Sequence, residues 1–224
     1  FRFYSIRYLV NNRLLAFISL KKCRKYAVST VFQKNELIKL GYKSDKIEIV
    51  PNCTDIEKYE PSPEGIKQFD TLPIKDDLIL YIGHFWDAKG VMDLLKAFLI
   101  IHKAQPSLNL VLAWSGLGDV EIINDFIRCH NLDNKIILLG RIKVQNLLAR
   151  ARLLVLPYKY SFGTVIFPNL ILEAFAVGIP VLTTDLEPIK EIVRHRETGF
   201  TAESSAPEDL AAKIVEILSM PPTE

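Results

Sequence analysis

The hydrophobic positions of the chain alternate between two patterns from residue 78 onward. Short runs that are apolar on both faces are typical of strands buried inside a parallel sheet. Five such runs occur, at Leu78–Ile82, Leu108–Ala113, Ile136–Leu139, Leu153–Leu156 and Pro180–Thr183. Helical spacing fills the gaps between them, at Val91–Phe98, Val120–Cys129, Val144–Ala151 and Asn169–Val177. This alternation predicts right-handed βαβ units, and therefore an α/β fold whose parallel sheet has helices on both faces.

Two helix ends carry additional signals. Gly178 follows the segment Asn169–Val177 and predicts a C-cap, because glycine adopts the left-handed conformation easily. The last helix is predicted to begin with a capping box formed by Ser205 and Glu208, with Pro207 in its first turn.

The first 55 residues do not follow the same alternation. We expect a helix over residues 5–25, a short strand at Tyr26–Ser29 and a short helix at Asn35–Leu40. The stretch from 57 to 76 is polar and contains three prolines, which is typical of a boundary between domains. One strand and two or three helices are too few to close a separate sheet. We therefore interpret residues 1–56 as the remnant of a larger N-terminal domain, and residues 57–220 as a second domain.

Charge is distributed unevenly along the chain. The 224 residues contain 28 basic and 26 acidic side chains, a net charge of +2. Residues 1–35 hold eight basic residues and no acid, whereas the remainder holds 20 basic and 26 acidic residues. Such asymmetry indicates a binding face or part of another domain. Contact with nucleic acid or with a membrane surface would suit this segment, but we favour a helix face covered by protein and expect no nucleic acid partner.

The composition excludes several classes of protein. Hydrophobic residues make up 49% and charged residues 24%, which is ordinary for a globular protein and unlike a disordered one. Three cysteines in this length give no disulfide framework and favour a reducing compartment. The longest apolar stretch, Val165–Leu182, contains Glu173 near its centre, so we expect a buried helix and strand and no membrane span. The N-terminal residues lack a signal-peptide layout.

Chemically useful residues follow the predicted strands, at the edge where open parallel sheets bind ligands. Gly83 and His84 follow the first strand, and Lys89 and Gly90 precede the next helix. Glycine allows close approach of a ligand, and a lysine supplies a point charge for phosphate. Two further pairs, Gly116 with Gly118 and Gly140 with Arg141, follow the second and third strands. The alternative for Gly116 and Gly118 is a tight turn, and the alternative for Arg141 is a side chain in solvent.

The segment around residues 167–178 is the most informative. Phe167, Pro168 and Asn169 open a helix whose free N–H groups can bind an anion. Glu173 lies one turn further on, within an apolar surround, and a carboxylate there requires a partner. Ribose hydroxyl groups would be suitable partners; the alternative is a glutamate that points to solvent.

Other kinds of site are not supported. The four histidines are scattered without the spacing of a metal site, and the sequence contains no Asp-x-Asp pair, Gly-x-Ser-x-Gly elbow or Walker loop. Position 121 is glutamate where a dinucleotide fingerprint would need its third glycine.

These features together resemble the retaining GT-B glycosyltransferases known as glycosyl transferases group 1, over about residues 27–218. The matching pieces, in order, are Ile49–Asp55, Tyr81–Phe85 with Lys89-Gly90, Ser115–Gly118, Leu138–Arg141, Phe167–Ala174 through Gly178–Val181, Glu191, and Thr198–Phe200. The resemblance implies a Rossmann-like C-terminal domain that binds a UDP-, GDP- or ADP-sugar, without a cofactor or metal. Transfer would go to a glycan, lipid-linked or polysaccharide acceptor in cell-envelope or polysaccharide synthesis.

The resemblance also implies residue roles. Lys89 and Glu173 would be the catalytic residues: Lys89 would neutralise the diphosphate leaving group, and Glu173 would hold the ribose. The donor-binding residues would be Gly83, His84, Gly116, Gly118, Arg141, Phe167, Asn169 and Leu170. The missing acceptor domain would be the partner of this chain, which alone would transfer sugar poorly or not at all.

Three positions depart from the family pattern. Val165 stands where the family usually has a second glutamate, His84 replaces an arginine and Cys53 replaces a glycine. They support an alternative, a catalytically impaired GT-B-like nucleotide-binding or scaffold module. A third interpretation is a membrane-surface module driven by residues 1–35. We expect a cytoplasmic protein, and leave open a peripheral contact of residues 1–35 with the inner face of the membrane.

Overall fold

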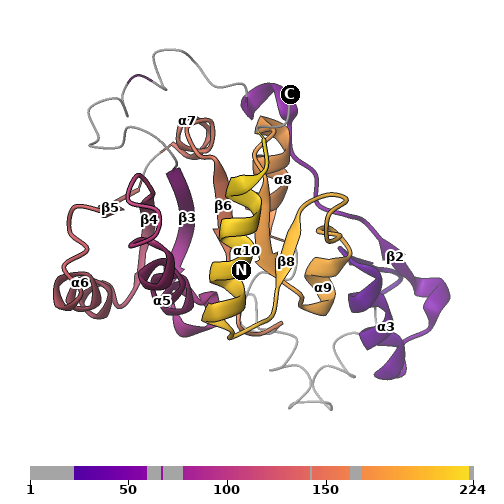
Figure 1. The fold of residues 1–224 in the computed structure, drawn as a ribbon. Coiled ribbons are helices and arrows are strands. Elements are labelled where there is room, and N and C mark those ends of the chain that lie inside the picture. The colour runs from indigo at the N-terminus through magenta and orange to yellow at the C-terminus, as the bar shows by residue number, and fades with distance from the viewer. Residues whose placement is uncertain (1–22, 60–66, 68–77, 142, 162–167, 222–224) are drawn as a thin grey trace.

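The computed structural model describes residues 23–59, 67, 78–141, 143–161 and 168–221. The predicted helix at 5–25 lies almost entirely outside these residues. Within them, the chain forms a six-stranded parallel sheet flanked by helices and a smaller N-terminal unit beside it (Figure 1).

The six strands of the main sheet are ordered β5-β4-β3-β6-β7-β8, all parallel. Their bounds are β3 Leu78–Phe85, β4 Asn109–Gly118, β5 Ile136–Leu139, β6 Leu153–Leu156, β7 Val181–Thr184 and β8 Phe200–Ala202. The five predicted strands are confirmed, although β3 and β4 extend further than expected. The pairing of β3 and β4 has a register irregularity between Gly83 and Phe85, beyond which Phe85 pairs with Gly118. The predicted α/β fold is therefore confirmed.

Both faces of the sheet are covered, as the two-sided apolar strands predict. One buried cluster packs the sheet against α5 (Val91–Ile101), α6 (Val120–Cys129) and α10 (Pro207–Ser219). The opposite cluster packs it against α7 (Val144–Leu148), α8 (Asn169–Val177) and α9 (Glu187–Lys190). Successive strand residues enter opposite clusters: Ile79 and Tyr81 enter the first, and Leu78 and Leu80 the second.

The helix-end predictions had different outcomes. Gly178 is the C-cap of α8 in the left-handed region, with φ 77°, as predicted. The capping box at Ser205 and Glu208 is wrong, because Ala206 is the N-cap of α10 and no side chain caps this end. Ser204 is turned inward to donate to the backbone oxygen of Lys159 at 2.8 Å. The proline at the first position of α10 is confirmed.

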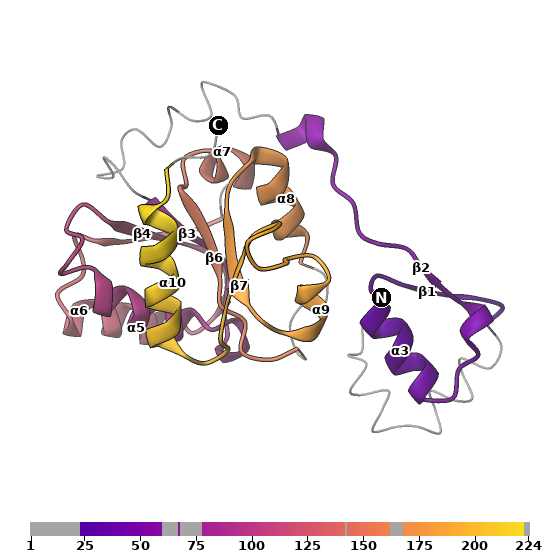
Figure 2. The ribbon, with the colours of Figure 1, turned by 45° about the vertical axis from the view of Figure 1, so that its right-hand side comes forward.

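The N-terminal unit comprises β1 (Tyr26–Val28), α3 (Val31–Lys39) and β2 (Ile47–Ile49), with β1 and β2 paired in parallel. Its helix begins four residues earlier than the sequence predicted, because Thr30 and Gln33 form a capping box there. A linker follows β2 and ends in a short 3-10 helix, Ile56–Tyr59, which contacts α8. Figure 2 shows this unit beside α9, with the linker running up toward α8.

Candidate active site

The strand order places a topological switch point between β3 and β6. The chain leaves β3 through α5 toward β4 on one side, and leaves β6 through α8 toward β7 on the other. Open α/β sheets bind ligands at such a point, beyond the carboxyl ends of the strands. The residues that follow the two strands, 86–90 and 157–161, therefore mark the candidate site.

These two connections are packed tightly against each other. Gly90 has φ 69°, and a Cβ atom at this position would lie 1.7 Å from the carbonyl oxygen of Pro157, so only glycine fits. The backbone N–H of Lys159 donates to the carbonyl oxygen of Ala88 at 3.1 Å. The Lys159 ammonium lies 2.7 Å from an Asp87 carboxylate oxygen. These contacts hold the loop that carries Lys89 against the residues that follow β6.

Lys89 is the most unusual residue of this loop. Its side chain is buried, with 8% of the residue exposed, and its Nζ atom lies 4.7 Å from the centre of the Tyr158 ring. Burial lowers the pKa of the Lys89 ammonium. Among the described residues, no carboxylate forms a salt bridge with it. Lysine is rarely buried without a counter-charge, so this ammonium is suited to a ligand anion.

Asp93 and Lys159 are functional candidates that the sequence reasoning missed. Asp93 is 6% exposed, in the first turn of α5, and its Oδ2 atom has no hydrogen-bond partner. The Lys159 ammonium lies 3.6 Å from this oxygen. Burial lowers the pKa of Lys159, but the hydrogen bond to Asp87 and the charges of Asp93 and Asp87 raise it by more. The sequence signal for Asp93 was its position as the lone acid in the apolar start of α5, Val-Met-Asp-Leu-Leu.

A second group forms at the carboxyl ends of β3, β4 and β5. The His84 ring hydrogen-bonds to the Ser115 hydroxyl and contacts the Trp86 ring, with centroids 4.5 Å apart. Arg141 donates from Nε to the Ser115 carbonyl oxygen at 3.0 Å. Burial, followed by the charge of Lys89, lowers the pKa of His84, which favours the neutral form of the ring. The predicted residues His84, Lys89 and Arg141 thus lie along one edge.

The predicted glycines occupy the same edge. Gly83 precedes His84 in β3, and Gly116 and Gly118 lie in the last part of β4. Gly118 is paired with Phe85 beyond a register irregularity, and Gly116 and Gly118 have φ 92° and 96°, so this segment is an irregular end of β4. A Cβ atom on Gly116 would approach only the Arg141 guanidinium, at 3.7 Å.

The remaining predicted residues belong to α8. Asn169 is the first residue of this helix and accepts a hydrogen bond from Asn52 of the linker at 2.8 Å. Glu173 is half-buried and accepts a hydrogen bond from the Tyr59 hydroxyl. Burial and this bond, in that order, raise the pKa of Tyr59. Leu170 packs against the core, whereas Phe167 and Val165 lie outside the described residues.

Residues 76–220 match the family model of glycosyl transferases group 1. The chain belongs to this family. It is 26% identical over 193 residues to N-acetyl-alpha-D-glucosaminyl L-malate synthase of Bacillus anthracis, covering 85% of this chain and 48% of that protein. It is 27% identical over 168 residues to an Escherichia coli UDP-Gal:alpha-D-GlcNAc-diphosphoundecaprenol alpha-1,3-galactosyltransferase, covering 70% of this chain and 41% of that protein. The chain thus spans about half the length of the curated relatives it matches.

A solved structure confirms the fold of this member of the group 1 family. Anabaena Alr3699/HepE, determined in complex with UDP and glucose, superimposes with a TM-score of 0.82 at 21% identity. The match covers 94% of this chain and 57% of that chain. Because the identity is low, the likeness concerns the fold and not the ligand.

The described residues also show neither a metal-binding cluster nor a membrane-spanning helix. No cluster of three or more His, Cys, Asp or Glu side chains there is arranged to hold a metal ion. No helix within the described ranges is both long enough and apolar enough to cross a membrane.

Proposed function

We propose that residues 57–220 form the donor-binding domain of a retaining, metal-independent glycosyltransferase, and that the ligand is a nucleoside diphosphate sugar. The observation that carries this proposal is the buried Lys89 ammonium, which has no carboxylate counter-charge among the described residues. It lies at the switch point of the sheet in a family of glycosyltransferases. A diphosphate supplies the missing negative charge.

Lys89 and α8 would then share the diphosphate. The first N–H groups of α8 carry a partial positive charge that favours an anion. When the sugar bond breaks, charge develops on the departing diphosphate, and a preorganised cation stabilises it more than the ground state. The cation–π contact with Tyr158 and the packed loop behind Gly90 hold Lys89 in place for this role.

Glu173 is proposed to bind the ribose hydroxyl groups. Its carboxylate presently accepts a hydrogen bond from Tyr59, which is the kind of bond that a ribose hydroxyl would donate. The linker and the ribose would therefore meet at the same carboxylate. His84, Gly83, Gly116, Gly118, Arg141, Asn169, Leu170 and Phe167 complete the proposed donor-binding set.

The rest of the protein's activity is proposed on the same basis. Residues 1–56 would be the remnant of the acceptor domain and the interdomain hinge. The base would be uracil, guanine or adenine. The acceptor would be a glycan, a lipid-linked sugar or a polysaccharide precursor in the cytoplasm, at the inner face of the membrane if the basic residues 1–35 contact lipid.

Binding of free nucleotides tests the donor-site proposal. We expect calorimetry to detect binding of UDP, GDP or ADP to this chain, and Lys89→Met to weaken it by about tenfold or more, as loss of a charge-assisted bond implies. Lys96→Met is the matched control, because Lys96 is exposed on the neighbouring helix α5. If none of the three nucleotides binds, or if both variants weaken binding equally, the proposal fails.

The second candidate is a module that binds nucleotide but has lost transfer activity. It is favoured by Val165 in place of glutamate and by His84, whose lowered pKa disfavours the positive charge that an arginine always carries. A transfer assay on the longest native protein containing this chain separates the two. Turnover of a nucleotide sugar would exclude the impaired module, and tight nucleotide binding without turnover would support it.

A further inference from the structure

The first turn of α3 has an unusually complete set of hydrogen-bond partners. A helix leaves its first N–H groups without intrahelical acceptors. The N–H of Thr30 donates to the Gln33 side chain at 3.2 Å, and that of Gln33 donates to the Thr30 hydroxyl at 3.1 Å. For the two groups between them, on Val31 and Phe32, the described residues of the N-terminal unit provide no acceptor.

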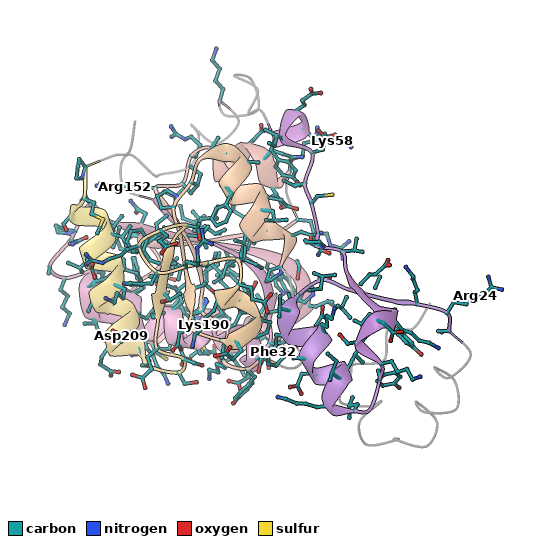
Figure 3. All side chains as sticks on the ribbon, turned by 90° about the vertical axis from the view of Figure 1, so that its right-hand side faces the viewer. Arg24, Phe32, Lys58, Arg152, Lys190 and Asp209 are labelled. Atoms are coloured by element: carbon teal, nitrogen blue, oxygen red, sulfur yellow. The ribbon has the colours of Figure 1, made fainter. Side chains whose placement is uncertain are left out.

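Glu191 satisfies both groups from the other side of the domain boundary. One carboxylate oxygen accepts from the Val31 N–H at 2.7 Å, and the other accepts from the Phe32 N–H at 2.6 Å. The contact spans 160 positions of sequence. Figure 3 shows Phe32 at the end of α3 that faces the donor domain, near Lys190 of α9.

Glu191 is attached to residues that are buried in the main sheet domain. It is the C-cap residue of α9, and the neighbouring Pro188, Ile189 and Val193 are buried in the core of the donor domain. The carboxylate is exposed, so packing does not require it there. Two oxygens in a fixed fork match two successive N–H groups, and the helix dipole favours negative charge at this end.

The contact adjoins the proposed donor site. The linker is attached to α8 through Asn52 with Asn169 and through Tyr59 with Glu173. The helices α8 and α9 precede and follow β7, so both attachments lie on the same side of the sheet. The orientation of the N-terminal unit is thus set beside the residues that would hold the sugar.

We propose that Glu191 is a positioning residue: a latch that caps α3 across the domain boundary and fixes the N-terminal unit relative to the donor domain. Its effect on sugar transfer rests on the proposed function, because the latch would align the acceptor side with the donor. If Glu191 acts as this latch, nucleotide binding is independent of Glu191, whereas the orientation of α3 depends on Glu191.

Amide exchange and helix orientation, measured by NMR on this chain, test the latch. In Glu191→Ala we expect the Val31 and Phe32 amides to exchange about tenfold faster, the loss expected for a charge-assisted cap. Glu191→Gln keeps one acceptor oxygen and should give an intermediate rate. Residual dipolar couplings of α3 should decrease relative to those of α10 in the alanine variant, a change that loss of a local cap alone would not produce.

Glu187→Ala is the control, because Glu187 lies on the same helix with its side chain 69% exposed and pairs only with Lys190 among the described residues. Unchanged exchange at Val31 and Phe32 in Glu191→Ala would overturn the proposal. Unchanged couplings of α3, or equal acceleration of the β3 amides, would also overturn it. Calorimetry with UDP, GDP and ADP on the same samples keeps the two proposals apart: absent binding of all three in wild type refutes the donor site and leaves the exchange result valid.

Discussion

The close packing of Gly90 against Pro157 can be tested by comparing two glycines of nearly equal backbone conformation. Gly90 has φ 69° and ψ 17°, and Gly178 has φ 77° and ψ 21°. An alanine Cβ at Gly90 would lie 1.7 Å from the Pro157 carbonyl oxygen, whereas at Gly178 it would meet nothing within 4 Å. Gly90→Ala and Gly178→Ala therefore share the backbone strain and differ in the collision.

The expected magnitudes follow from these distances. The left-handed conformation costs an alanine about 1–2 kcal/mol, so Gly178→Ala should lower the free energy of unfolding by about that amount. A carbon–oxygen contact needs about 3.3 Å, so Gly90→Ala must displace Pro157 by about 1.5 Å within a dense interior. Overpacking of this kind adds about 1–3 kcal/mol. We expect a total loss of about 2–5 kcal/mol for Gly90→Ala.

Urea unfolding of both variants measures the difference, provided that the slope with denaturant stays constant. A second readout is UDP affinity, which should fall in Gly90→Ala because Lys89 is displaced, and should stay near wild type in Gly178→Ala. Equal losses of stability in the two variants would refute the packing of the two connections at the switch point.

Two further predictions concern ionisable groups near the site. Lys159→Met should lower the free energy of unfolding by about 1–3 kcal/mol in urea, because it leaves the buried Asp93 without its cation, and Asp93→Asn in the same chain should restore part of the loss. Lys190→Met, which removes exposed ion pairs, should change the free energy of unfolding by less than about 1 kcal/mol. A loss in Lys190→Met as large as that in Lys159→Met would argue against the Asp93 contact. Because the folded pKa of His84 lies below its usual 6.5, the unfolded chain binds more protons between these values. Stability should be full above pH 6.5 and decline as the pH falls toward the folded pKa, and His84→Gln should reduce that slope in thermal melts; an unchanged slope would contradict the assignment.

The strands and helices that the sequence predicts well are those with strong periodicity. Val120–Cys129 and Asn169–Val177 are confirmed as α6 and α8, and the two-sided apolar runs are confirmed as central strands. The strand β8 and the short helix α9 were not predicted. Each has three or four residues, too few to establish a period. The capping box at Ser205 was wrong because Ser204 and Ser205 take part in tertiary contacts and a positive-φ turn instead.

Sequence signals point to the proposed site where a residue type implies its partner. A lysine before a helix at the sheet edge suggested phosphate, and the structure adds the burial that strengthens this interpretation. Long-range partners were not predictable, because Tyr59 with Glu173 and Glu191 with Val31 are far apart in sequence. Lys159 was missed for the same reason: its importance depends on Asp93 and Asp87, which only the folding of β3 beside β6 brings near it.

Mapping UDP binding onto the backbone amides by NMR shows whether a nucleoside diphosphate binds at the carboxyl edge around Lys89. We predict that shifts concentrate in residues 83–90, 115–118 and 169–173, and that at the same UDP concentration they decrease strongly in Lys89→Met but persist in Lys96→Met. Shifts confined to other segments, or a map that Lys89→Met leaves unchanged, would contradict it.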